Sequence, residues 1–133
     1  MAGYSGTPLP QKLGIRPGAR LRFVAAPEGF AGALGELPAG VRFVARGTAD
    51  VVVFFTDRRA ELGRRFAPLA RGLDRAGGLW IAWPKKVSGL PTDLDENAVR
   101  EIGLSAGLVD NKVCAIDETW SGLRFVVRLV DRK

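Results

Sequence analysis

Residues 50–55 read Asp50-Val51-Val52-Val53-Phe54-Phe55. Five consecutive large apolar residues without polar alternation indicate a strand that is buried on both faces. Burial on both faces is typical of a parallel sheet that has helices packed on either side. We therefore expect this strand to lie at the centre of the sheet.

The residues after this strand predict a helix and then another strand. Residues 57–73 carry apolar side chains at helical spacing, with Arg64 and Arg71 on the opposite side, which predicts an amphipathic helix with a basic outer face. Pro68 should bend or break this helix, because proline lacks a backbone donor. Residues 79–83, Leu-Trp-Ile-Ala-Trp, predict the next strand.

The C-terminal part predicts one more helix and a hairpin. Asp95 is placed to cap a helix that Gly107 can close in a left-handed conformation. Residues 111–118 and 123–130 predict two strands, and the short connection between them, residues 119–122, implies antiparallel pairing.

Toward the N-terminus, residues 41–45 and 21–25 predict two further strands, with a short helix or turn over residues 29–34. Residues 1–19 are rich in Gly and Pro and show no period, so we expect an N-terminal arm that either lies over the domain or is partly mobile. Residues 20–133 then form a single Rossmann-like α/β domain. Its predicted architecture is a three-layer, mostly parallel sheet with a C-terminal antiparallel hairpin.

The amino-acid composition excludes several kinds of catalytic and metal site. The 133 residues include no histidine, which excludes histidine acid/base catalysis, a Ser-His-Asp or Cys-His pair and the commonest zinc ligand sets. The one cysteine, Cys114, has no partner for an internal disulfide and reads as a small buried hydrophobe. The start of the chain lacks a secretory signal pattern. We expect a cytoplasmic protein with no membrane segment, no metal and no bound cofactor.

Ligands of parallel α/β sheets bind beyond the carboxyl ends of the strands, which nominates three loops. The ligand-binding candidates in and beside them are Glu28, Asp57, Trp83, Lys85, Lys86 and Ser88. The two lysines could hold a phosphate or carboxylate, or they could only keep the loop soluble. Asp57, although among these candidates, is most simply a helix cap. Trp80 and Trp83 cannot share a strand face, so we expect Trp80 in the core and Trp83 as a stacking platform near the crevice.

Charge is divided along the chain, whose net charge is +6. Residues 57–86 hold eight basic and three acidic residues, whereas residues 91–118 hold seven acidic and two basic. A basic patch on the predicted helix could meet nucleic acid, and it consists of Arg58, Arg59, Arg64, Arg65 and Arg71. The same residues could form a plain solvated face, or meet the acidic helix of a second copy in a homodimer.

Three long motifs carry a resemblance to a known family: residues 3–9 (GYSGTPL), residues 83–89 (WPKKVSG) and residues 110–125 (DNKVCAIDETWSGLRF). On these motifs the chain resembles a family of small bacterial proteins classed as a domain of unknown function. This resemblance does not assign any particular activity to the chain. At the level of layout, residues 20–133 are similar to a shortened class I S-adenosylmethionine-dependent methyltransferase. That family has a Gly-rich turn after its first strand, whereas this chain has Ala25-Ala26-Pro27-Glu28-Gly29. The resemblance therefore implies a reduced relative that has lost the cofactor.

Three functions remain open. The first is a non-catalytic binding or regulatory module whose crevice takes a small anionic ligand or a partner segment. The second is an enzyme of the methyltransferase type, since methyl transfer depends on positioning more than on acid/base groups. The third is nucleic-acid binding through the basic helix. The missing histidine and the missing Gly-rich turn favour the first.

Overall fold

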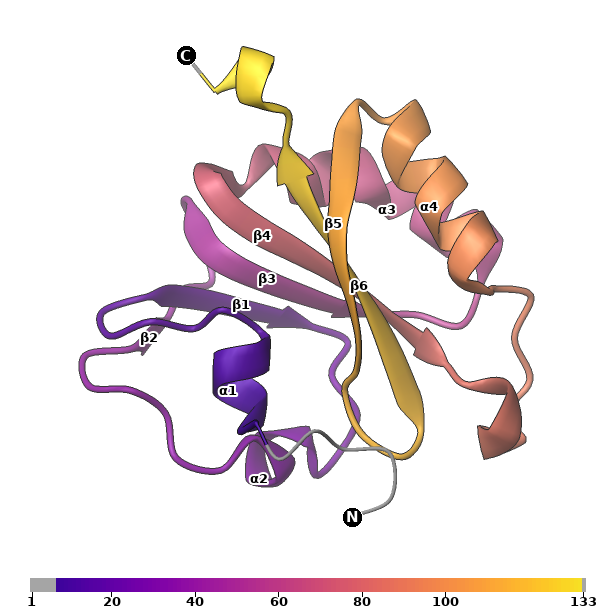
Figure 1. Cartoon of the computed structure of the whole chain (residues 1–133), viewed down its shortest axis with the longest axis horizontal. Coiled ribbons are helices and arrows are strands. Elements are labelled where there is room, and N and C mark those ends of the chain that lie inside the picture. The colour runs from indigo at the N-terminus through magenta and orange to yellow at the C-terminus, as the bar shows by residue number, and fades with distance from the viewer. Residues whose placement is uncertain (1–6, 133) are drawn as a thin grey trace.

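The computed structural model describes residues 7–132, which form one six-stranded sheet with helices on both faces (Figure 1). The strands in chain order are β1 (Arg20–Val24), β2 (Arg42–Phe43), β3 (Ala49–Phe55), β4 (Leu73–Pro84), β5 (Leu108–Ala115) and β6 (Trp120–Val127). The α-helices are α1 (Leu9–Lys12), α2 (Phe30–Leu34), α3 (Arg59–Arg71) and α4 (Glu96–Ser105). Two short 3-10 turns are η1 (Lys86–Ser88) and η2 (Leu129–Asp131).

The sheet has the predicted mixed topology. Its order is β2-β1-β3-β4-β6-β5, in which the first four strands run parallel. Strand β6 pairs antiparallel with both β4 and β5, so the C-terminal hairpin forms the far edge. The expectation of a mostly parallel Rossmann-like sheet with a C-terminal antiparallel hairpin is confirmed.

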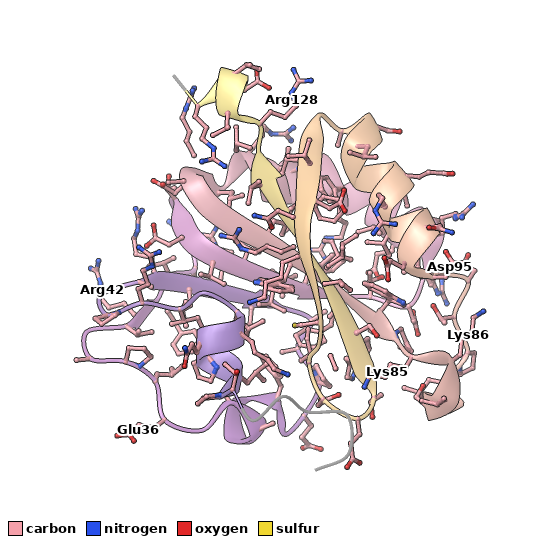
Figure 2. The ribbon with its side chains drawn as sticks, viewed as in Figure 1. Glu36, Arg42, Lys85, Lys86, Asp95 and Arg128 are labelled. Carbon is pink, nitrogen blue, oxygen red and sulfur yellow. The ribbon has the colours of Figure 1, made fainter. Side chains whose placement is uncertain are left out.

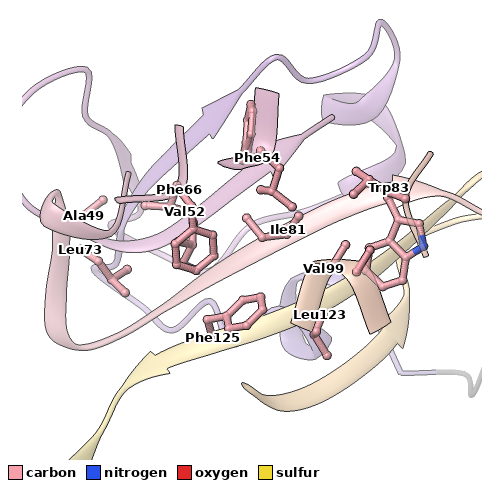
Figure 3. Close-up of a cluster of buried hydrophobic side chains, with 14 residues drawn as sticks. Ala49, Val52, Phe54, Phe66, Leu73, Ile81, Trp83, Val99, Leu123 and Phe125 are labelled. Atoms are coloured by element: carbon pink, nitrogen blue, oxygen red, sulfur yellow. The ribbon is translucent and has the colours of Figure 1, made fainter. Parts of the chain in front are cut away.

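Strand β3 lies in the middle of the parallel part, as its sequence predicts, and all its residues except Asp50 are buried. Val51, Val53 and Phe55 face α2 and the segment after α1. Val52 and Phe54 face α3 and α4, where they join the apolar cluster drawn in Figure 3. Burying apolar surface on both faces of one strand makes β3 the shared wall of two cores.

Helix α3 differs from the prediction, because Pro68 neither breaks nor divides it. Pro68 is exposed and lies three residues before the last helical residue. The hydrogen bond that proline removes therefore falls on the solvent side of the last turns, where water can bond the freed carbonyl. The helix ends at Arg71, and Leu73, expected in the helix, begins β4 by pairing with Ala49.

Helix α4 begins as predicted. The side chain of Asp95 accepts a hydrogen bond of 2.8 Å from the backbone N–H of Ala98, which makes Asp95 the N-cap. Gly107, just past the helix, has a φ of 95°, the left-handed conformation expected of a closing glycine.

The C-terminal hairpin lies about three residues nearer the N-terminus than predicted, because residues 116–119, and not 119–122, connect its strands. Asp117 makes this turn: its Oδ1 accepts hydrogen bonds of 2.8 Å from the backbone N–H groups of Thr119 and Trp120. Trp120 is therefore the first residue of β6, where its ring contacts Phe55 edge-on at 5.2 Å.

The N-terminal arm packs against the sheet from α1 onward. Leu13 is fully buried and Ile15 nearly so, on the same face as α2. The motif residues 3–6 lie outside the described residues. Within residues 7–132, no helix combines the length and the apolar character needed to cross a membrane.

Candidate functional site

The carboxyl ends of β1, β3 and β4 meet at one edge of the sheet because these strands are parallel. From β1 the chain crosses to β2 on one side, and from β3 it crosses to β4 on the other. The strand order therefore reverses between β1 and β3. This is the position at which parallel α/β sheets commonly bind ligands.

The turn after β1 is strained. Ala25 has a φ of 57°, and it is the one non-glycine residue among residues 7–132 with a positive φ. The left-handed region costs an alanine about 1–2 kcal/mol. The turn ends at Gly29, whose φ is 89° and whose Cβ position faces open space, and both residues are exposed. Phe30 anchors the start of α2, with its ring edge-on to Phe55 at 4.8 Å.

The residues after β3 form a closed cap on α3. Thr56 is buried, and its hydroxyl donates to Oε1 of Glu61 at 2.6 Å while accepting from the backbone N–H of Arg58 at 3.3 Å. Asp93 supplies the next cap, because its Oδ1 accepts a hydrogen bond of 2.6 Å from the backbone N–H of Arg59. The first free amides of α3 are thus taken by the chain's own oxygens.

Asp57, expected as a helix cap, does not cap α3: the N-cap residue is Arg58, and the oxygens on the helix come from Thr56 and Asp93. The side chain of Asp57 is exposed, and its carbonyl accepts a hydrogen bond of 2.7 Å from the Thr92 hydroxyl. The segment with Thr92 and Asp93 therefore lies across the end of β3. A cap that comes from 34 residues away leaves no local pattern for sequence analysis to detect.

The loop after β4 is built by Ser88. Its hydroxyl donates to the carbonyl of Lys85 at 2.6 Å and accepts from the backbone N–H of Leu90 at 3.2 Å. The backbone N–H of Lys85 donates to the carbonyl of Thr119 at 2.8 Å, which joins this loop to the turn before β6. Figure 2 shows Lys85 beside the end of the β5–β6 hairpin and Lys86 farther out. The two lysines therefore point to different places.

The structure corrects the prediction that Trp83 is accessible. It was expected as an accessible stacking platform, but its side chain is only 5% exposed and packs with Leu94 and Val99 in the core under α4 (Figure 3). Trp80 is buried on the opposite face, as the alternation of strand side chains predicts. The segment before α4 covers Trp83, and local sequence does not reveal such a cover.

The other candidates lie on the same edge without forming a cluster. Glu28 is exposed on the turn after β1, and Asp57 is exposed after β3. Among the six candidates, within residues 7–132, a hydrogen bond joins only Ser88 to Lys85. The edge thus presents an open, strained turn beside β1 and a closed cap beside β3.

The five arginines of the basic patch do not lie on one common face of α3. Arg64 and Arg71 are exposed on its outer side, whereas the guanidinium of Arg65 lies 5.0 Å from the centre of the Phe54 ring, against the sheet. Arg58 and Arg59 lie at the capped N-terminus. A nucleic-acid partner for this helix stays a prediction.

A second charged region lies at the opposite edge, where β1, β3 and β4 begin, and no pattern in the sequence predicts it. Arg124 and Arg16 line a hollow there. These two residues are 108 positions apart, and no spacing rule relates them.

No protein-family model matches this sequence, and no curated protein matches it. The resemblance to the small bacterial family therefore stays a prediction. Solved structures do match the fold. Magnesium protoporphyrin IX methyltransferase from Synechocystis PCC 6803, with bound SAM, is 13% identical with a TM-score of 0.57, covering 90% of this chain and 74% of that chain.

Two further solved structures match the same fold. Aeropyrum pernix fibrillarin, in complex with natively bound S-adenosyl-L-methionine, is 11% identical with a TM-score of 0.54, over 93% of this chain and 70% of that one. A putative methyltransferase from Thermoplasma acidophilum is 10% identical with a TM-score of 0.56, over 86% and 70%. The layout of this chain is therefore that of the class I S-adenosylmethionine-dependent methyltransferase fold.

Proposed function

We propose that this chain binds an adenosyl ligand of the S-adenosylmethionine type at the turn between Ala25 and Gly29. The observation that carries the proposal is the left-handed backbone of Ala25, directly after β1 and beside the switch point of the strand order. Backbone strain of this kind persists where the surroundings enforce it, and it concentrates at ligand-binding sites. The fold is shared with proteins whose structures hold S-adenosylmethionine.

The residues present fit such a ligand at the turn. Ala25 and Ala26 are small and exposed, and Gly29 has open space at its Cβ position, so a ligand can approach the backbone closely. Glu28 is the carboxylate that the turn itself supplies, and a carboxylate accepts hydrogen bonds from ribose hydroxyls. Pro27 takes one N–H donor away from the turn.

The fit is poorer beside β2. The residues just after this strand, Val44, Ala45 and Arg46, include no carboxylate for a ribose. The expected affinity is therefore lower than that of a site with an acidic residue there. S-adenosylmethionine would supply an electrophilic methyl group when bound. The chain's own contribution is to hold the ligand at the turn and to leave its outer side open to a partner.

A second candidate is a module at the same edge that binds without turnover. The observation that favours it is the hydrogen bond from the Arg59 N–H to Asp93, because a carboxylate of the chain already takes a helix-end amide beside β3. With this part of the edge closed, the turn after β1 is left as the accessible part. Lys85 and Lys86 would then serve an anionic ligand or a partner segment next to it.

Isothermal titration of the purified chain with S-adenosylhomocysteine, and then with S-adenosylmethionine, tests the proposal. We expect dissociation constants in the micromolar range. Ala25→Gly should keep binding, because glycine adopts a positive φ freely, whereas Ala25→Val should lose it, because a β-branched residue is strongly disfavoured there. Ala39→Val, at an exposed alanine in the loop before β2 and away from the turn, is the matched control.

A folded protein that gives no heat with either ligand at millimolar concentration would rule out the adenosyl site. Equal affinities for the Ala25→Val and Ala25→Gly variants would rule out the turn as its location. Binding without transfer of a labelled methyl group to any offered acceptor would favour the second candidate.

A further inference from the structure

A hollow of about 380 Å³ lies at the amino ends of β1, β3 and β4, opposite the edge discussed above. Arg16, Gly18 and Ala19 line it from the segment before β1, and Asp74 and Gly77 line it from β4. Arg124 on β6 forms another part of its wall. A volume of this size lies in the range of small-molecule sites.

The carboxylates of the hollow already have partners. Asp50 forms a two-bond ion pair with Arg20, at 2.8 Å and 3.0 Å, and also accepts the backbone N–H of Arg20 at 2.8 Å. Asp74 lies 3.5 Å from the same guanidinium and accepts the backbone N–H of Ala76 at 2.9 Å. The pKa of Asp50 is held below its ordinary value, first by the hydrogen bond from the Arg20 side chain. Both carboxylates are therefore committed to Arg20.

Arg124 lacks such a partner. Its guanidinium is half-buried, its one hydrogen bond within residues 7–132 is a long one of 3.3 Å to Oδ1 of Asn111, and no carboxylate there lies within ion-pair distance. Burial, followed by the positive charges of Arg132 and Arg16, lowers the pKa of Arg124. Arg16 and Arg124 thus both line the hollow, and their guanidinium groups carry more donors than the described residues occupy.

The backbone makes room for this guanidinium. A Cβ at Gly78 would lie 2.6 Å from Cζ of Arg124, so the guanidinium lies directly against the backbone of β4 where a side chain would otherwise stand. A side chain with five donors is thus held in place at the hollow with four of them uncommitted.

We propose that this hollow binds a small molecule bearing a phosphate monoester, with Arg124 and Arg16 holding the phosphate. The charged residues that line the hollow, together with Arg20, leave one positive charge in excess: Arg16, Arg20 and Arg124 against Asp50 and Asp74. This excess favours an anionic ligand, and a phosphate monoester offers three acceptor oxygens to the free guanidinium donors. Guanidinium groups on two separate segments can each bond oxygens of one tetrahedral phosphate, and the remaining volume accommodates an organic body.

Titration of the full chain with ribose 5-phosphate tests this site, with ribose as the uncharged control and citrate as the carboxylate control. We expect saturable binding of ribose 5-phosphate that is stronger than that of citrate, and none of ribose. Arg124→Gln should weaken binding about tenfold or more, because it removes a charge-assisted pair of hydrogen bonds. Arg16→Gln, at an exposed side chain, should weaken it similarly. Arg64→Gln on the outer side of α3 should leave it unchanged.

Binding should also weaken as pH falls from 7.5 to 5, since the second pKa of a phosphate monoester is about 6. Absence of saturable binding at millimolar ribose 5-phosphate would overturn the proposal. So would affinities in Arg124→Gln and Arg16→Gln equal to that of the parent chain, or citrate binding as tightly as the phosphate. The site is separate from the adenosyl proposal: Ala25→Val should not change ribose 5-phosphate binding, and Arg124→Gln should not change S-adenosylhomocysteine binding.

Discussion

The indole Nε1 of Trp80 donates a hydrogen bond of 3.0 Å to the carbonyl of Leu13 in fully buried surroundings. The two residues are 67 positions apart, and the bond ties the segment after α1 to the middle of β4. This segment continues into Arg16 and so forms one wall of the hollow at the amino edge. The bond therefore helps to place that wall.

We expect Trp80→Phe to lower the free energy of unfolding by about 2–4 kcal/mol. The change leaves the buried Leu13 carbonyl without a donor and also removes apolar volume. Urea denaturation measures the loss. Trp120→Phe is the matched control, since Trp120 is only partly buried, and it should cost less. A cost for Trp80→Phe no larger than that of the control would argue against a structural role for the bond.

Asp93→Ala should lower the free energy of unfolding by about 1 kcal/mol, the usual cost of losing a helix cap. Asp57→Ala should change it by less than about 0.5 kcal/mol, because that side chain is exposed and is not the cap of α3. Thermal or urea unfolding of the two variants measures the difference. A larger loss of stability in Asp57→Ala than in Asp93→Ala would instead identify Asp57 as the cap of α3, as the local sequence suggests.

Asp50→Asn should change how stability depends on pH. The ion pair with Arg20 lowers the pKa of Asp50 in the folded chain, so the folded state binds this proton less readily than the unfolded state. The pair's contribution is present above the unfolded value of about 3.9 and is lost as pH falls through the lower, folded pKa. Unfolding curves at pH 7 and pH 3 should therefore differ less in the variant than in the parent chain.

Glu36→Gln, at an exposed carboxylate, controls for the loss of one acidic group. It should keep the acid dependence of the parent chain. If Glu36→Gln reduced the difference in stability between pH 7 and pH 3 as much as Asp50→Asn does, the effect would come from net charge and not from the ion pair.

Gly103→Ala and Gly63→Ala should have opposite effects, although both lie within helices. A Cβ at Gly103 would come within 2.5 Å of Cδ2 of Phe125, so α4 must move away from the sheet at a cost of about 1–3 kcal/mol. A Cβ at Gly63 meets nothing within 4 Å, and alanine in α3 should add up to about 1 kcal/mol. Melting temperatures of the two variants, shifted in the same direction, would contradict this packing.

Local patterns in the sequence were sufficient for several elements. The apolar run of β3 predicts its central place, the Asp95 cap predicts the start of α4, and the spacing of Trp80 and Trp83 predicts their opposite faces. Each of these depends on neighbours within a few residues, where burial period and capping chemistry act directly. The hairpin was predicted in kind but misplaced by about three residues, because the hydrogen bonds of Asp117 define its turn.

The sequence by itself therefore determined the fold class, the mostly parallel sheet and the loops at its carboxyl edge. Only the tertiary structure decided which of the candidate residues are accessible there: it buries Trp83 under the segment before α4 and caps α3 with Asp93. It alone also brings Arg16 and Arg124 to one hollow at the opposite edge. The last two arrangements join residues 34 and 108 positions apart, and tertiary packing, not local propensity, creates all three.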